Sequence, residues 1–348
     1  MKILIRNGRA TAFVAGALLS VSLVTPAAAT PPTPASGAIW STGQLEYRWL
    51  TGSEPPAWMR TAIHAAAQYA SGTSMADTPG FRYAGDGVGW IGYTDNIPTQ
   101  YAVGYAVRNV PNSFGIRLRP HGHVLDWGTL RWCQFYENPP TGCYDAELIT
   151  LHEIGHVLTL GHIDESTVTD WTDTIMHAAP KTKAKIGWNA HEFGRCDAAR
   201  LQLRYGPASS SSRISTCLDL ETSLGLSASP GTAIEHGSPV TLWATLRIDV
   251  DSPAGVLAGN PLSGRSVWLQ RRPQGSSSWT DIAQMTGSSD EGRYFRTLSV
   301  TGPVEYRARF SAPAHDGVGD ATSGVVRISV DDPCVSSGGS GSINAPTC

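Results

Sequence analysis

The sequence predicts an α+β fold, in which strands and three helices form a first domain and strands alone form a second. Two observations carry this prediction. Helical signals occur in only three segments, whereas the last third of the chain contains seven short β-type runs between turn residues. The composition agrees, because 37 Gly and 23 Pro favour turns, and 41% hydrophobic residues with 11 Trp suffice to form folded cores.

The first 29 residues have the features of a secretory signal peptide. Basic residues precede an apolar run at 10–24, and Ala27–Ala29 supplies the small residues of a cleavage site. An uncleaved membrane anchor is the alternative, but a membrane span needs about 20 apolar residues. We therefore expect a secreted, extracellular protein that does not insert into a membrane.

The charge of the chain argues against nucleic-acid binding. The formal net charge is −3, and only four of the 26 basic residues are Lys, so no large basic surface is expected. Removal of the signal peptide takes away three of the 26 basic residues and none of the 29 acidic ones, which leaves a net charge of −6.

The first domain is predicted at 38–217, after a Pro- and Ala-rich leader at 30–37 that we expect to be mobile. It opens with an alternating strand at 45–50 and a helix whose first turn contains Pro56. Turn residues then separate four further strand candidates, which lie at 81–83, 88–93, 101–107 and 114–118.

Two more helices complete this domain. One is predicted at 145–158 with Asp145 as its N-cap, and the other at 197–205, where Gly206 and Pro207 end it. A Ser-rich linker follows at 209–212.

The second domain is predicted at 218–332 as a β-sandwich, and a Gly/Ser-rich tail at 333–348 follows it. Its seven β runs lie at 224–228, 240–246, 267–271, 279–285, 294–300, 304–310 and 325–330.

All six cysteines lie after the signal peptide, so secretion makes disulfide bonds the expected state. Six cysteines allow 15 connectivities. The spacing favours pairing of sequence neighbours, namely Cys133–Cys143, Cys196–Cys217 and Cys334–Cys348. No Cys-x-x-Cys pair supports a zinc ribbon.

The motif HEIGH at 152–156 carries the strongest chemical signal. Residues four apart lie on one face of a helix, so His152 and His156 can bind one metal ion while Glu153 points to a metal-bound water. Imidazole is a good zinc ligand, and a catalytic zinc site uses three protein ligands plus water. A solvated helix with a coincidental motif is the alternative.

His162 is the expected third ligand. It lies ten residues after His152, so the helix must end and the chain must turn back to bring it to the same metal ion. Asp164 is the alternative third ligand, since a carboxylate also binds zinc. A calcium site could use nearby acids, but solvated loop acids are the favoured interpretation of Asp164, Glu165, Asp170 and Asp173.

The segment 152–162, HEIGHVLTLGH, resembles the zinc helix of the metzincin metalloproteases, and most closely that of their matrixin, or matrix-metalloprotease-like, branch. The segment 173–177 resembles the Met-turn of that family. The similarity covers about residues 44–206. It implies a mixed, twisted sheet with three helices, one catalytic zinc, Met176 as an apolar floor under the histidines, and an edge strand at 101–107 that aligns the substrate.

Several features depart from the family pattern. Thr159 stands where the family has Gly at the turn after the helix, so either Thr159 is strained or Gly161 takes the turn instead. The spacing between His162 and Met176 is longer than in most matrixins. The segment that binds a structural zinc in vertebrate matrixins is missing. The region between the signal peptide and Cys133 contains no cysteine, so it cannot form a cysteine-switch propeptide.

The resemblance implies a secreted zinc endopeptidase that acts on protein or peptide substrates, with Glu153 as the general base. We expect a monomer. A secreted adhesion or cell-wall/carbohydrate-binding protein with an inactive protease-like domain is the alternative, and the intact Glu153 favours the enzyme. The second domain resembles bacterial immunoglobulin-like modules at 267–272 and 306–310, and both a spacer and a weak binding role remain open for it.

Overall fold

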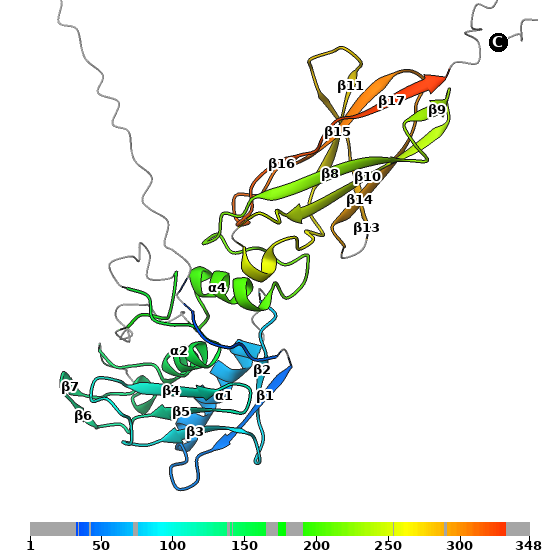
Figure 1. Cartoon of the computed structure of the whole chain (residues 1–348). Coiled ribbons are helices and arrows are strands. Elements are labelled where there is room, and N and C mark those ends of the chain that lie inside the picture. The colour runs from blue at the N-terminus through cyan, green and yellow to red at the C-terminus, as the bar shows by residue number, and fades with distance from the viewer. Residues whose placement is uncertain are drawn as a thin grey trace, which may run out of the picture.

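The structure is a computed structural model, and it is α+β, as the sequence predicts. Its described part contains three α-helices, α1 (Ala57–Ser71), α2 (Ala146–Val157) and α4 (Arg195–Tyr205), together with several sheets (Figure 1). The predicted signal peptide and the predicted tail lie outside the described residues. The structure describes residues 33, 35–41, 43–71, 76–137, 140, 142–164, 173–178, 191–252, 254–288 and 291–331.

The first sheet has five strands in the order β2-β1-β3-β5-β4. Three of the pairings are parallel, and only the edge strand β4 runs antiparallel to its neighbour β5. All the strands predicted in this region are present, as β1 (Gln44–Trp49), β2 (Gly80–Tyr83), β3 (Gly89–Tyr93), β4 (Gly104–Asn109) and β5 (Ser113–Leu118).

The edge strand begins at Gly104, three residues later than the predicted start at Tyr101. The reason is a buried arginine. The Arg119 guanidinium donates hydrogen bonds to the carbonyl oxygens of Thr99 and Ala102 (2.8 Å to the latter), so this segment is held by a side chain and not by a strand ladder.

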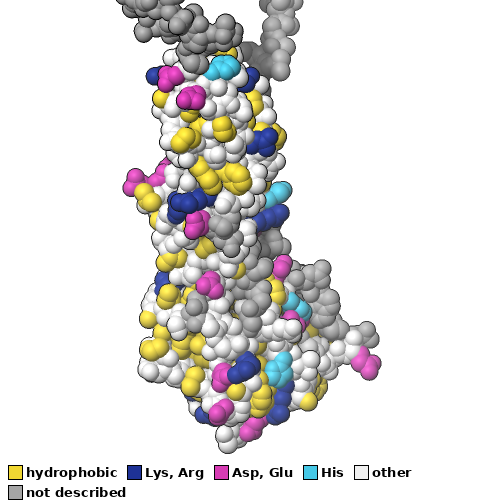
Figure 2. Space-filling model, turned by 90° about the vertical axis from the view of Figure 1, so that its right-hand side faces the viewer, with side chains coloured by type: hydrophobic (Ala, Val, Ile, Leu, Met, Phe, Trp, Pro, Cys, Tyr) yellow, Lys and Arg dark blue, Asp and Glu magenta, His cyan; other side chains and the backbone are white. Residues whose placement is uncertain are grey.

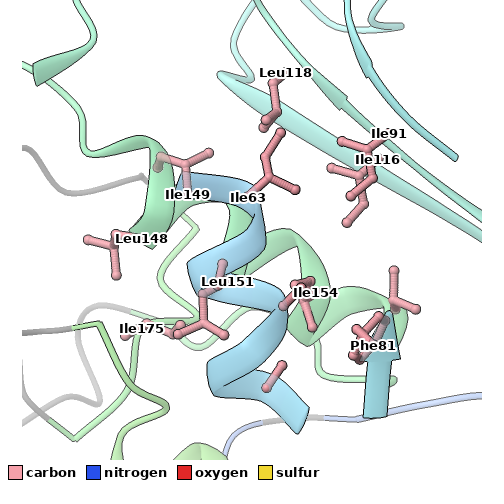
Figure 3. Close-up of a cluster of buried hydrophobic side chains, with 14 of the residues drawn as sticks. Ile63, Phe81, Ile91, Ile116, Leu118, Leu148, Ile149, Leu151, Ile154 and Ile175 are labelled. Carbon is pink, nitrogen blue, oxygen red and sulfur yellow. The ribbon is translucent and has the colours of Figure 1, made fainter. Parts of the chain in front are cut away.

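Helices α1 and α2 cover one face of this sheet and form the first core. Figure 3 shows Ile63 of α1 directed toward Ile116 and Leu118 of β5, and Ile154 of α2 belongs to the same buried core. Helix α2 begins where predicted, because the Asp145 carboxylate accepts the amides of residues 147 and 148 at 2.8 and 3.1 Å. The predicted metal-binding motif therefore lies on a capped helix whose apolar side is fixed in the core.

The C-terminal part of the chain consists of two facing sheets around a second hydrophobic core. Each of the seven predicted β runs corresponds to a strand: β8 (Thr222–Ser229), β10 (Pro239–Ile248), β11 (Val267–Pro273), β12 (Thr280–Gln284), β14 (Arg293–Ser299), β15 (Val304–Phe310) and β17 (Val326–Asp331). Short strands β9 (Ala233–Glu235), β13 (Thr286–Ser288) and β16 (Ala321–Thr322) add to them. On the face in Figure 2, basic and acidic side chains are interspersed.

Helix α4 lies between these two parts of the molecule (Figure 1). Leu201 and Tyr205 belong to the first core, whereas Ala199 belongs to the second. The predicted Ser-rich linker after α4 is held in place, since the Arg265 guanidinium donates to the carbonyl oxygens of Ser211 and Ser212 at 3.0 and 2.8 Å.

Two of the three predicted disulfides are present, Cys133–Cys143 and Cys196–Cys217. The predicted pair Cys334–Cys348 lies outside the described residues. Within the described ranges, every helix is too short or too polar to cross a membrane.

Candidate metal centre

Three histidine side chains converge at the exposed side of α2. The Nε2 atom of His162 lies 3.3 Å from Nε2 of His152 and 3.1 Å from Nε2 of His156. Together they form a group that could hold a metal ion. The alternative ligand Asp164 is not part of this group, so the described geometry favours the three histidines over the carboxylate.

Backbone carbonyl oxygens fix the orientation of two of these rings. The Nδ1 atom of His152 lies 2.8 Å from the carbonyl oxygen of Ile175, and Nδ1 of His156 lies 2.8 Å from that of Leu160. A ring that donates its Nδ1 proton presents an unprotonated Nε2. Burial lowers the pKa of His152 well below its usual value and that of His156 to about 4, so both rings are neutral near pH 7.

The turn that returns His162 to the helix is made by Thr159. Its backbone has φ of +85°, and its amide donates to the carbonyl oxygen of His156 at 3.0 Å. Gly161 is not among the residues with positive φ, so the expectation that it might take over the turn is wrong. The Thr159 hydroxyl is buried and has no hydrogen-bond partner in the described structure.

Glu153 lies beside the histidines and is buried between α2 and the edge strand. The amide of Ala106 donates to its carboxylate, whereas Oε2 is buried without a hydrogen-bond partner among the described residues. Burial raises the pKa of Glu153 to about 8. Gly104 makes this close approach possible, because a Cβ atom there would lie 2.6 Å from Oε1 of Glu153.

A cavity of about 450 Å³ opens in front of these residues. The three histidines and Glu153 line one side of it, and β4 lines another. The outer edge of β4 is unpaired in the five-stranded sheet, so its backbone groups border the cavity.

Met176 is fully buried beneath α2. It packs against Gly155, where a Cβ atom would lie 2.5 Å from the Met176 sulfur. The sequence placed Met176 under the histidines by resemblance, and the structure brings it to the helix that carries two of them.

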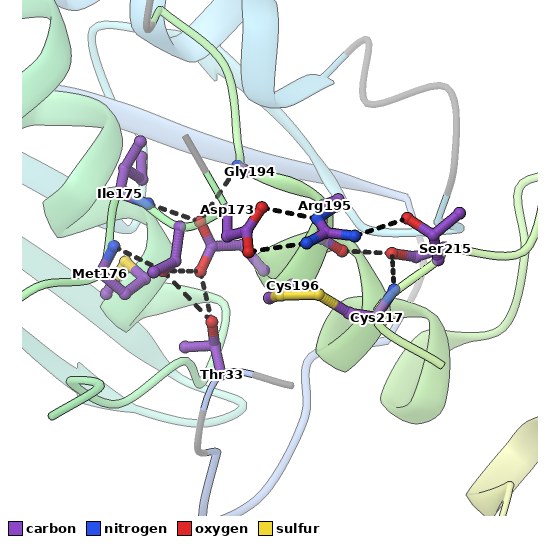
Figure 4. Close-up of a disulfide and its surroundings, with 12 residues drawn as sticks. Thr33, Asp173, Ile175, Met176, Gly194, Arg195, Cys196, Ser215 and Cys217 are labelled. Carbon is purple, nitrogen blue, oxygen red and sulfur yellow. Dashed lines mark hydrogen bonds and ion pairs between the residues drawn. A yellow bond between two sulfur atoms is a disulfide. The ribbon is translucent and has the colours of Figure 1, made fainter. Parts of the chain in front are cut away.

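The segment before Met176 is held by Asp197, a residue that the sequence reasoning missed. Its carboxylate accepts hydrogen bonds from the hydroxyls of Thr174 and Thr33 at 2.5 and 2.6 Å, and from the amide of Ile175 at 2.8 Å (Figure 4 labels Thr33 and Ile175). Since the Ile175 carbonyl orients His152, Asp197 supports the metal centre indirectly. The sequence offered one indication of this role, because Asp197 lies in the first turn of α4, where a carboxylate can accept hydrogen bonds from backbone amides.

Asp173, one of the calcium candidates, has another role. Its carboxylate pairs with the Arg195 guanidinium at 2.5 and 2.8 Å and is almost fully buried. Asp173 is therefore engaged in an ion pair inside the fold. Glu165 and Asp170 lie outside the described residues.

The described part of the predicted leader is bound to the site, contrary to the expectation that it is mobile. We call residues 33 and 35–40 the N-terminal strap. The Ser36 amide donates to the carbonyl oxygen of Thr159 at 3.2 Å, and Ala35 forms an antiparallel bridge with Leu160. The strap thus contacts the turn whose carbonyl orients His156. The hydrophobic periodicity of the sequence could not predict this contact, because the strap and the turn at Thr159 are far apart in the sequence.

Three arginines donate to carbonyl oxygens of the strap. Arg200 donates to Thr33 at 2.6 Å, Arg204 donates to Gly37, and Arg108 of β4 donates to Ser36 and, at 3.5 Å, to Ala38. These bonds join the strap to α4 and to the edge strand.

Comparisons with known proteins do not assign this chain. No protein-family profile matches it, and no curated protein matches it. Among solved structures, a superoxide reductase (neelaredoxin) from Ignicoccus hospitalis matches with 12% identity over 31% of this chain and 80% of that chain, at a TM-score of 0.23. A variant of the same protein matches at 11% identity and a TM-score of 0.22, over the same shares. Similarity this low informs neither the fold nor the function.

Proposed function

We propose that the protein is a secreted zinc endopeptidase with a matrixin-like metzincin catalytic domain and a C-terminal immunoglobulin-like domain. The observation that carries this proposal is the convergence of three imidazole Nε2 atoms beside a buried glutamate, in a cavity bordered by an unpaired strand edge. The predicted signal peptide and the two disulfides support secretion.

The donor set fits zinc. Imidazoles are typical zinc ligands, and two of the three rings here, those of His152 and His156, have an Nδ1 atom that faces an orienting carbonyl oxygen. We assign His152, His156 and His162 as these ligands. Zinc bound there would lower the pKa of a water molecule and polarise a scissile carbonyl group.

We assign Glu153 as the general base. Its Oε1 side is held by the Ala106 amide, which leaves the buried Oε2 to take a proton from water and then deliver it to the leaving amine. Burial raises the pKa of this carboxyl to about 8, and the positive charge of a zinc ion held by the neighbouring histidines would lower it again, so that the carboxylate could accept the proton.

We propose that the substrate is an extended peptide that adds to the outer edge of β4. Backbone hydrogen bonds with the outer groups of Gly104–Asn109, apart from the Ala106 amide that binds Glu153, would align the peptide without reading its sequence. The scissile bond would then lie next to Glu153, which the Ala106 amide ties to this strand.

The test compares casein cleavage by the mature wild-type protein and by Glu153→Gln. We expect the variant to bind about one zinc per chain and to lose activity by roughly 10² to 10⁴-fold, since only the base is removed. Glu147→Gln, on the same helix but outside the cavity, is the matched control and should keep full activity.

A chelator should abolish wild-type cleavage, and added zinc should restore it. Equal activity of Glu153→Gln and wild type would refute the assignment of the base. A wild-type protein that binds zinc but cleaves nothing would instead favour the adhesion or cell-wall/carbohydrate-binding alternative.

A further inference from the structure

The two ends of the cleft along β4 differ in chemistry. Tyr101 and Tyr105 line one end, and the Trp127 indole reaches the same end by donating to the carbonyl oxygen of Tyr101 at 3.3 Å. Tyr101 is 68% exposed and Trp127 46% exposed, so this end offers an aromatic surface. At the other end, Arg108 lines the cavity together with Ser36 and Thr159.

Strand geometry turns Arg108 toward the metal centre. Alternate residues of a strand share a face, so Arg108 emerges on the same side of β4 as Gly104 and Ala106. Gly104 lies against Glu153 on that side. At about 3.3 Å per residue, Arg108 lies roughly 7 Å along the strand from Ala106, whose amide binds Glu153.

No carboxylate neutralises Arg108 within the part of the chain that the structure describes. Its two hydrogen bonds go to uncharged carbonyl oxygens of the strap, and a guanidinium has five N–H donors. Burial lowers the pKa of Arg108, and of its two titratable neighbours Tyr205 raises this pKa while the cation Arg204 lowers it. The Thr159 hydroxyl at the same end of the cleft is buried and has no hydrogen-bond partner in the described structure.

We propose that this end of the cleft is a subsite for an acidic side chain, and that the protein prefers peptides with Asp or Glu there. The inference rests on the proposed peptidase function and names its substrate class. A carboxylate is the group that an Arg guanidinium binds best, with two parallel hydrogen bonds. The acidic residue should lie about two positions from the scissile bond, as the distance along β4 requires.

The test uses peptides that carry a single Glu or Gln at each position around a cleavable bond. For one position we expect kcat/KM to be about tenfold higher with Glu than with Gln, which is the size expected of a charge-assisted contact in a partly open site. In Arg108→Gln this ratio should fall to about 1. In Arg108→Lys, which keeps the charge, a reduced preference should remain.

Arg204→Gln is the matched control. Arg204 also clamps the strap, through the carbonyl of Gly37, but it does not line the cavity. This variant should keep the wild-type Glu/Gln ratio. If Arg204→Gln lost the preference as fully as Arg108→Gln, the strap and not a subsite would explain it, and the inference would be overturned.

Binding of the same peptides to Glu153→Gln, followed by fluorescence anisotropy, separates this inference from the proposed function. A Glu preference in binding that disappears in the double variant with Arg108→Gln supports the subsite even if the wild type cleaves no peptide. Cleavage without any Arg108-dependent Glu preference would overturn the subsite and leave the peptidase proposal standing.

Discussion

Thr159 adopts a backbone conformation that glycine accepts without cost. At φ of +85°, its β-branched side chain pays about 1–2 kcal/mol of steric strain, and its buried hydroxyl has no partner in the described structure. The strain persists because the turn is fixed on both sides, by the hydrogen bond to His156 and by the strap. Strained residues of this kind concentrate at functional sites.

Thr159→Gly should therefore stabilise the protein. We expect the free energy of unfolding to rise by roughly 1 kcal/mol, because relief of strain exceeds the extra backbone entropy of glycine in the unfolded chain. Urea denaturation followed by tryptophan fluorescence measures it. Thr61→Gly, at an exposed position of α1, is the control and should lower the same quantity by roughly 0.5 kcal/mol. A loss of stability in both variants would mean that Thr159 is not strained.

The sequence predicted the local features of the site but not its supports. The spacing of His152, His156 and His162 and the capping role of Asp145 are local patterns, and the structure places these residues as expected. Asp197 escaped notice because one of its hydrogen-bond partners, Thr33, lies 164 residues away. Contacts over such distances leave no periodic pattern in the sequence.

Among the elements, the N-terminal strap links the two carbonyls that orient the His152 and His156 rings of the candidate metal centre. One end reaches Ile175 through the Thr33 hydroxyl and Asp197, and the other end pairs with Thr159 and Leu160. The described hydrogen bonds of the strap do not involve the side chains of His152, His156 or His162. Its effect on the centre should therefore pass through ring orientation.

Ser36→Pro should weaken zinc binding. Proline removes the amide that donates to the Thr159 carbonyl, so the turn that orients His156 loses a support, and we expect the zinc dissociation constant to rise about tenfold. Competition with a chromophoric chelator measures it. Ile39→Pro is the control, since the described backbone hydrogen bonds of the strap do not use the Ile39 amide. Equal zinc affinity in the two variants would rule out this support.

At the scale of the whole molecule, α4 is buried on both sides. Its Gln202 side chain donates to the carbonyl oxygen of Arg213 at 2.7 Å and accepts the amide of Ser215 at 3.0 Å. Ser215 is in turn close to Gly317, because a Cβ atom at Gly317 would lie 1.9 Å from the carbonyl oxygen of Ser215. The segment 213–215 after α4 therefore contacts the helix through Gln202 and the C-terminal part through Gly317.

Gln202→Leu should destabilise the whole chain. It leaves the buried Ser215 amide and the Arg213 carbonyl without their partner, and we expect a loss of roughly 2 kcal/mol in the free energy of unfolding. Gln284→Leu on β12, where the glutamine is exposed, should change it by less than about 0.5 kcal/mol. Calorimetry of both variants measures these changes in the free energy of unfolding. Equal changes in the two variants would show that the Gln202 hydrogen bonds do not stabilise the fold.

Because α4 contributes Leu201 to one core and Ala199 to the other, the two halves of the chain are not interchangeable modules. Recombination that joined the N-terminal part to a foreign C-terminal module would leave an apolar face of α4 in water. In the present molecule, Ala199 and Leu203 pack against the second core, and the Leu203 carbonyl oxygen lies close to Gly255. A chimera that folds well would need a C-terminal domain that buries the same two side chains. Genetic shuffling would therefore tend to transmit the two halves together.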